Sequence, residues 1–76
     1  MPTETILHLL ENGKWHNLKD IPQETKLNPF KVEYITRFLA KYNFVKINET
    51  TDKVKLDPTM NKFLKKIEKL ETEEKQ

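Results

Sequence analysis

Three stretches of the chain repeat apolar residues with the 3.6-residue period of an α-helix. The first spans residues 3–12 and is followed by Gly13, a residue type that often ends helices. The second spans residues 29–42, and the third begins at Pro58. Each of the last two begins at the proline of an Asn-Pro or Asp-Pro pair, in which the preceding side chain can cap the helix. In the second stretch, the recurring apolar residues are Val32, Ile35, Phe38, Leu39 and Tyr42.

The segment between the first two stretches is shorter and less regular. Residues 14–16 are too few for a helix and predict a brief extended segment. Asn17 then has the character of a helix cap, and the residues after it predict a short helix that ends near Thr25. Pro22 would forfeit a backbone hydrogen bond in the middle of that helix, so the helix is expected to start late or to kink.

Beyond the second stretch, the hydrophobic period changes from 3.6 to two. Asn43, a residue type that tolerates the left-handed conformation, marks the end of the helix. Residues 44–48 and 53–56 then alternate apolar and polar side chains, and the connection 49–52 lacks glycine, which predicts a loop longer than two residues. One face would carry Val45, Ile47, Val54 and Leu56, and the other Lys46, Lys53 and Lys55. Residues 44–56 are therefore predicted to form a β-hairpin.

This order of elements, together with the residues around its turns, resembles a winged helix-turn-helix domain. The matching residues are Leu18-Lys19-Asp20-Ile21, Leu27-Asn28-Pro29, Val32, Ile35, Phe38-Leu39 and Tyr42-Asn43-Phe44-Val45. Over residues 3–57, the chain is similar to small prokaryotic, particularly archaeal, winged-helix transcription regulators. Two positions depart from that family, since Lys26 stands where glycine is frequent and Pro22 where a small helix former is usual. The resemblance implies an α+β, mostly α fold: a winged helix-turn-helix domain at 1–57 with a three-helix core and a β-hairpin wing, then a C-terminal helix at 58–76.

The resemblance also implies how such a protein would act. In this family the third helix, here residues 29–42, enters the DNA major groove, and the wing, residues 44–56, lies on the phosphate backbone. Arg37 would then read guanine with two hydrogen bonds, and Asn28 or Tyr34 would reach a base or a phosphate. The candidate DNA-binding residues are Asn28, Lys31, Tyr34, Arg37, Lys41, Lys46, Lys53 and Lys55.

Several of these residues also have a purely structural interpretation. Lysines on helices and hairpins are usually only solvated, and Tyr34 could lean against the edge of the core. Glu33 on the same helix would repel phosphates. Phe30, near the start of that helix, is either tucked toward the short helix or exposed as a contact.

Composition narrows the classes of function. The 76 residues, 36% of them hydrophobic, suffice for one small core and no second domain. The chain has no cysteine and two histidines, so disulfides and thiolate zinc sites are excluded, and neither a metal nor a cofactor is expected. It lacks a catalytic carboxylate pair, a Ser/His/Asp set and a glycine-rich phosphate loop, so it is not expected to be an enzyme. With no predicted membrane span or signal peptide, a cytoplasmic location is expected.

Charge is distributed unevenly along the chain. The net charge is +2, but residues 28–56 alone carry six Lys or Arg side chains and three carboxylates. Residues 1–27 are slightly acidic, and residues 57–76 are balanced. The positive charge therefore gathers on the second long helix and the hairpin.

The last helix has an apolar stripe of its own, with the a and d spacing of two heptads. Its members are Met60, Phe63, Ile67 and Leu70. Two heptads are too few for a strong coiled coil, so the stripe either folds back onto the first helix or pairs with its twin in a symmetric dimer. Regulators of the family commonly dimerise through terminal helices, and this resemblance favours a homodimer.

Two functions follow from these observations. The leading hypothesis is sequence-specific or architectural binding of double-stranded DNA, most simply as a small transcription regulator. The alternative is a winged-helix protein-protein interaction module within a transcription or other assembly, because a fold does not determine a function. Clustering of Lys31, Arg37 and Lys41 favours DNA, whereas Glu33 and the small net charge favour a protein partner.

Overall fold

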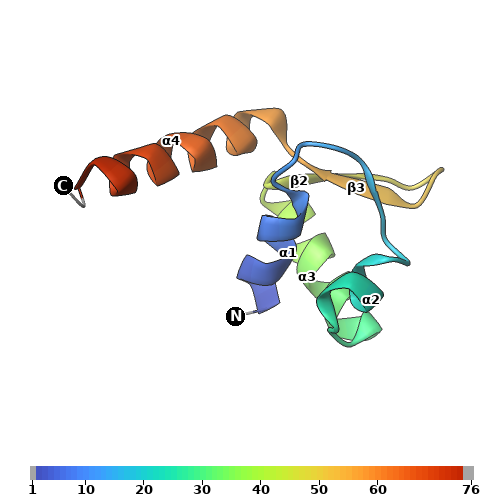
Figure 1. Ribbon diagram of the computed structural model, residues 1–76. Coiled ribbons are helices and arrows are strands. Elements are labelled where there is room, and N and C mark those ends of the chain that lie inside the picture. The colour runs from blue at the N-terminus through green and yellow to red at the C-terminus, as the bar shows by residue number, and fades with distance from the viewer. Residues whose placement is uncertain (1, 75–76) are drawn as a thin grey trace.

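The computed structural model describes the backbone of residues 2–74 and the side chains of residues 2–72. A short strand separates the first two helices, two strands follow the third helix, and a long helix follows the sheet (Figure 1). The elements are α1 (Pro2–Leu10), β1 (His16–Asn17), α2 (Ile21–Thr25), α3 (Pro29–Lys41), β2 (Val45–Asn48), β3 (Lys53–Leu56) and α4 (Pro58–Glu74). The protein is an α+β, mostly helical domain whose arrangement is compatible with a winged-helix layout.

The two longer helices begin at the predicted capping residues. The Asn28 side-chain oxygen accepts a hydrogen bond from the backbone nitrogen of Phe30 at 2.8 Å, at the start of α3. The Asp57 carboxylate accepts one from the backbone nitrogen of Thr59 at 3.0 Å, at the start of α4. Each cap satisfies a backbone donor that has no partner within its helix.

The short helix α2 starts late, at Ile21, with Pro22 in its first turn, as expected. The prediction that Asn17 caps this helix is wrong. Its side chain instead accepts a hydrogen bond from the backbone nitrogen of Lys19 at 3.0 Å, in the turn before the helix. Lys26 ends the helix with a φ of 61°, in the left-handed region that favours glycine.

The three strands form an antiparallel sheet in the order β1-β3-β2. Within the hairpin, Val45 pairs with Leu56 and Ile47 pairs with Val54, which confirms the prediction that these four residues share one face. β1 joins the other side of β3, with His16 opposite Val54. The expected extended segment after the first helix is therefore an edge strand of the sheet.

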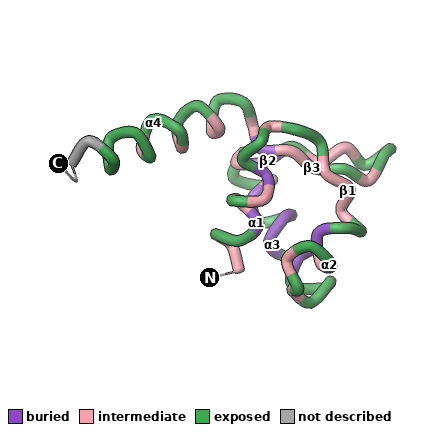
Figure 2. Tube along the Cα trace, in the orientation of Figure 1, coloured by how far each residue is buried: buried purple, intermediate pink, exposed green. Residues whose placement is uncertain are grey.

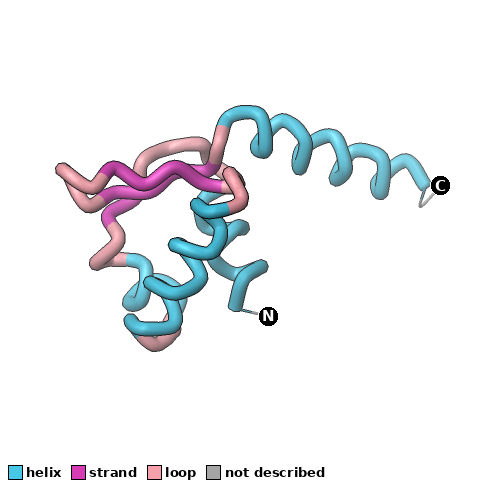
Figure 3. Tube along the Cα trace, turned by 180° about the vertical axis from the view of Figure 1, so that it is seen from behind, coloured by secondary structure: helices cyan, strands magenta, loops and turns pink. Residues whose placement is uncertain are grey.

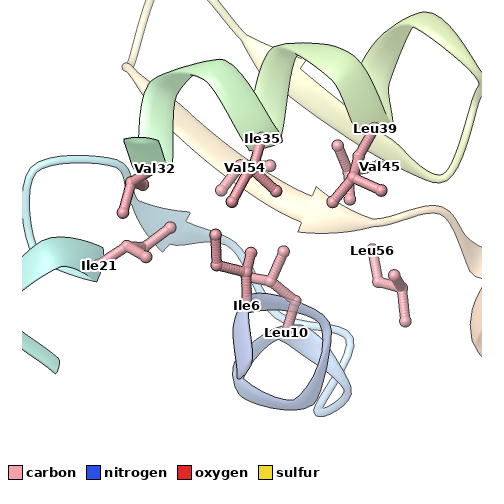
Figure 4. Close-up of a cluster of buried hydrophobic side chains, with 9 residues drawn as sticks. All are labelled: Ile6, Leu10, Ile21, Val32, Ile35, Leu39, Val45, Val54 and Leu56. Carbon is pink, nitrogen blue, oxygen red and sulfur yellow. The ribbon is translucent and has the colours of Figure 1, made fainter. Parts of the chain in front are cut away.

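Nine apolar side chains from the helices and the hairpin form one core (Figure 4). They are Ile6, Leu10, Ile21, Val32, Ile35, Leu39, Val45, Val54 and Leu56. The sheet lies on one side of α1, α2 and α3 (Figures 1 and 3). One face of the hairpin therefore packs toward α3, and the opposite face is turned away from the helices.

Helix α4 leaves this core rather than folding back along α1 (Figure 1). The longest dimension of the molecule is accordingly 43 Å, against 23 and 19 Å for the other two. Met60 and Leu64, near the start of α4, pack against the core, whereas most of the helix is exposed (Figure 2). The alternative in which the whole apolar stripe of α4 covers α1 is therefore wrong.

Candidate nucleic-acid interface

Helix α3 contacts the core along one side only. Val32, Ile35 and Leu39 are buried on that side (Figure 4), and Thr36 on the same helix is also buried. The Thr36 hydroxyl donates a hydrogen bond to the backbone oxygen of Glu33 at 3.0 Å, which satisfies this polar group within the helix. Side chains on the other side of α3 are exposed from the first turn to the last.

Four aromatic side chains follow one another along α3 and its C-terminal cap at intervals of four residues. Phe30 is 81% exposed, Tyr34 74%, Phe38 49% and Tyr42 55%. Four residues advance a helix by about 6 Å, so these rings form a row about 18 Å long. The Phe38 and Tyr42 rings contact each other, with their centroids 5.0 Å apart. We call these four residues the aromatic row.

The structure decides between the alternatives for two residues of the aromatic row and corrects the prediction for the other two. Phe30 does not tuck toward α2 and is more exposed than any other large apolar side chain in the described part of the chain. Phe38 and Tyr42, which the helical period assigned to the buried stripe, are about half exposed because three aliphatic residues already occupy the contact with the sheet. Tyr34 is exposed as well and does not lean against the core.

Two lysines accompany the aromatic row. Lys31 and Lys41 are exposed, and neither forms an ion pair with another residue among those described. The Lys41 Nζ lies 5.9 Å from the centroid of the Tyr42 ring, near the outer limit of a cation–π contact. Two positive charges without carboxylate partners thus lie on the same helix as the exposed rings.

Arg37 is also exposed on α3, but carboxylates hold its guanidinium. Its Nη1 donates to Glu49 Oε1 at 2.6 Å, and its Nη2 lies 3.5 Å from Glu49 Oε2. Glu33, one turn earlier, lies 3.9 Å from Nε. The hydrogen bond with Glu49 raises the pKa of Arg37, and the same bond lowers the pKa of Glu49. The guanidinium that was predicted to read guanine is therefore occupied by the hairpin tip.

Asn28 was predicted both to cap α3 and to reach a base or a phosphate, and the structure shows the first of these roles. Its side-chain oxygen is committed to the backbone nitrogen of Phe30, the bond that caps α3. An asparagine that pairs with adenine needs both its oxygen and its amide nitrogen. Pairing with adenine would therefore require the Asn28 oxygen to accept a second hydrogen bond beside the one that caps α3.

The three hairpin lysines do not join α3 in one surface. The apolar side chains of the hairpin point into the core, so the alternation of a strand places the lysines on the outer face of the sheet. These lysines are Lys46, Lys53 and Lys55. Lys46 lies across from Lys55, whose Nζ is 4.8 Å from the centroid of the Trp15 ring. Since the tip itself carries Glu49 and Asp52, the structure divides the predicted interface into an α3 surface and a separate group of lysines.

A groove of about 470 Å³ runs between α2, α3 and the hairpin. Pro22, Val32 and Ile47 contribute apolar walls, and Glu33 and Arg37 line it from α3. The ion pair between Arg37 and the hairpin tip therefore lies beside this groove. It ties the hairpin to one flank of α3 and leaves the aromatic row uncovered.

The four residues predicted as a dimer contact on α4 are also divided by the fold. Met60 packs against the core of its own chain, and Ile67 is half-buried. Phe63 and Leu70 are 55% and 53% exposed. The part of α4 that extends beyond the core therefore presents two large apolar side chains to solvent.

Comparisons of the chain with protein-family models, with curated proteins and with solved structures found no match. Within residues 2–74, none of the helices combines the length and the apolar character needed to cross a membrane. The function proposed below is therefore inferred from the geometry of α3, the hairpin and α4.

Proposed function

We propose that the protein binds double-stranded DNA as a winged-helix protein, with α3 in the major groove. The observation that supports this most directly is the free side of α3, where Lys31 and Lys41 are exposed and lack ion-pair partners among the described residues. The major groove of B-DNA is about 12 Å wide and admits an α-helix of about 10–12 Å diameter. α3 would face the base edges, and the two lysines would neutralise nearby phosphates.

The hairpin would serve as a wing beside the inserted helix. The ion pair between Arg37 and Glu49 holds its tip against the flank of α3. Its lysines, which lie on the outer face of the sheet, would attract DNA through their charge rather than by contacts with the bases. They are Lys46, Lys53 and Lys55. Most of the contact with bases would therefore come from α3.

A small transcription regulator of this kind would act as a homodimer, and α4 offers the contact. Phe63 and Leu70 are exposed and seven residues apart, the spacing of one heptad. Among the described side chains, the first half of α4 carries Lys62, Lys65 and Lys66, and the second half carries Glu68, Lys69 and Glu71. An antiparallel pair of α4 helices would thus place a basic half beside an acidic half. Two-fold symmetry would present two α3 helices to major grooves about 34 Å apart.

Fluorescence anisotropy with a short labelled duplex tests the proposal. Each phosphate contact contributes about one unit to the slope of log affinity against log salt concentration. Lys31→Ala/Lys41→Ala should therefore flatten that slope by about two units between about 50 and 200 mM salt. Lys14→Ala/Lys19→Ala removes the same charge outside α3, α4 and the hairpin and should keep the wild-type slope.

The Lys31→Ala/Lys41→Ala variant can also contradict the proposal. If it remains folded by circular dichroism and binds DNA with unchanged affinity and slope, DNA does not contact the free side of α3. An equal loss in the control variant would show instead that total charge, rather than the α3 surface, determines binding.

The aromatic row favours a second function, that of a protein-interaction module. Aromatic side chains are enriched in protein interfaces, and exposed apolar surfaces often mark them. Under this function, the folded wild-type protein would bind no duplex even at about 50 mM salt. The same anisotropy series therefore distinguishes the two candidates.

A further inference from the structure

The aromatic row occupies the part of α3 that would approach the bases. Phe30 is the second residue of the helix, and the first residues of an inserted recognition helix contact base edges. We infer that α3 selects thymine-rich duplexes through apolar contacts with thymine methyl groups, an inference that rests on the proposed binding of duplex DNA. Phe30 and Tyr34, the two most exposed rings of the row, make these contacts.

Helix α3 offers few groups that can read bases by paired hydrogen bonds. Arg37 is the only arginine in the sequence, and Glu49 binds its guanidinium at 2.6 Å. The helix contains no asparagine or glutamine, the residue types that pair with adenine, and the oxygen of Asn28 is used in the cap. The two lysines suit phosphates, because an ammonium group is a point charge on a flexible stem. The surface left to meet the base edges is therefore mainly apolar.

Thymine is the base whose major-groove edge carries an apolar group, the C5 methyl. Phe30 and Tyr34 lie about 6 Å apart along the helix axis, close to two base-pair steps of about 3.4 Å each. Each ring can thus cover a methyl group, with the two methyl groups two base pairs apart. Burial of one methyl group corresponds to about a fourfold gain in affinity, so two methyl groups would contribute about 16-fold.

The arrangement of the rings favours a duplex over a single strand. Single strands bind by stacking their bases on free aromatic faces. The Phe38 and Tyr42 rings instead contact each other at a tilt of 58°, so they do not form a continuous stacking platform. Lys31 and Lys41 supply the positive charge that a phosphate backbone requires. A protein partner with an apolar surface would leave these two charges unpaired.

Replacing thymine with deoxyuridine tests the inference, because it removes the methyl groups and keeps the phosphate charges and the base pairing. Anisotropy would compare an alternating A·T duplex with the same duplex containing deoxyuridine at every thymine. We expect the wild-type protein to bind the deoxyuridine duplex about tenfold or more weakly. Phe30→Ala/Tyr34→Ala should bind both duplexes equally, and it should remain folded because both side chains are exposed. His8→Ala removes an exposed ring from α1, away from every proposed contact, and should keep the wild-type ratio.

A second pair of probes adds the methyl group instead of removing it. An alternating G·C duplex with 5-methylcytosine should bind more tightly than its unmethylated form, because the added methyl lies in the same groove. Equal binding of the thymine and deoxyuridine duplexes would overturn the inference and leave the proposed DNA binding intact. Binding of neither duplex by the folded protein would overturn both. Tighter binding of a thymidine single strand than of the duplex would overturn the inference in favour of base stacking.

Discussion

Replacement of Glu49 with glutamine should strengthen DNA binding, because Glu49 holds the Arg37 guanidinium in the free protein. The contact is bidentate, with distances of 2.6 and 3.5 Å, and it lies on the flank of α3. A phosphate could reach the guanidinium only by displacing this carboxylate, which would itself repel DNA. Glutamine keeps the size of the side chain and removes its charge.

The size of the gain follows from counterion release. One additional contact between a cation and a phosphate steepens the slope of log affinity against log salt concentration by about 0.9. Between about 50 and 200 mM salt, this difference changes the relative affinity of variant and wild type by about 3.5-fold. At about 50 mM salt, we expect Glu49→Gln to bind between about three and ten times more tightly than the wild type.

The gain should be independent of pH near neutrality. The hydrogen bond from Arg37 lowers the pKa of Glu49, so the carboxylate stays charged at and above its ordinary pKa of about 4. A carboxylate with a lowered pKa stabilises the folded state above its unfolded pKa, and this contribution is lost as the pH falls through the folded pKa. The difference between variant and wild type should therefore be constant from about pH 6 to about pH 8.

Anisotropy titrations at both salt concentrations measure this effect. Glu4→Gln removes the same charge from an exposed position on α1 and should leave the slope unchanged. If Glu49→Gln matches the wild type in affinity and slope, while Lys31→Ala/Lys41→Ala weakens binding, Arg37 does not contact DNA. That result would refute the argument that Glu49, at the hairpin tip, keeps Arg37 from binding a phosphate.

Two further predictions concern α4 and the core. Phe63→Glu/Leu70→Glu should convert a concentration-dependent dimer into a folded monomer with lower DNA affinity, because both side chains lie outside the core. Sedimentation equilibrium measures this, and a wild-type mass of 9.1 kDa at every micromolar concentration would contradict the dimer. Leu39→Ala should lower the free energy of unfolding by about 2–5 kcal/mol, because Leu39 is only 3% exposed. Denaturant unfolding checks the value, and a loss below about 1 kcal/mol would show that the core closes around the missing side chain.

Local chemistry made much of the fold predictable. Asn28 and Asp57 mark the starts of α3 and α4 because their side chains satisfy backbone donors only a few residues away. Alternation in the hairpin predicted which four apolar residues share a face, since a shift by one residue would have exposed that face. Asn17 was misassigned because an asparagine can cap a turn as readily as a helix.

The candidate site was less predictable because it depends on contacts between distant segments. Helical spacing placed Phe38 and Tyr42 in the buried stripe, but it carries no information on how wide a face the sheet covers. The ion pair between Arg37 and Glu49 joins residues 12 positions apart and requires the hairpin tip to lie beside α3. The direction of α4 likewise depends on where the helix leaves the core, which its own periodicity does not report.

Chemical-shift mapping by NMR tests the central claim most directly, because it locates bound DNA on the folded protein. A ¹⁵N-labelled sample would be titrated with an A·T-rich duplex at low salt, and the shift of each backbone amide recorded. We predict that the largest changes lie in α3 from Phe30 to Lys41, with small changes at Lys46 and Lys55 on the outer face of the sheet. Changes confined to that outer face, or no changes at saturating duplex, would contradict the placement of DNA on α3.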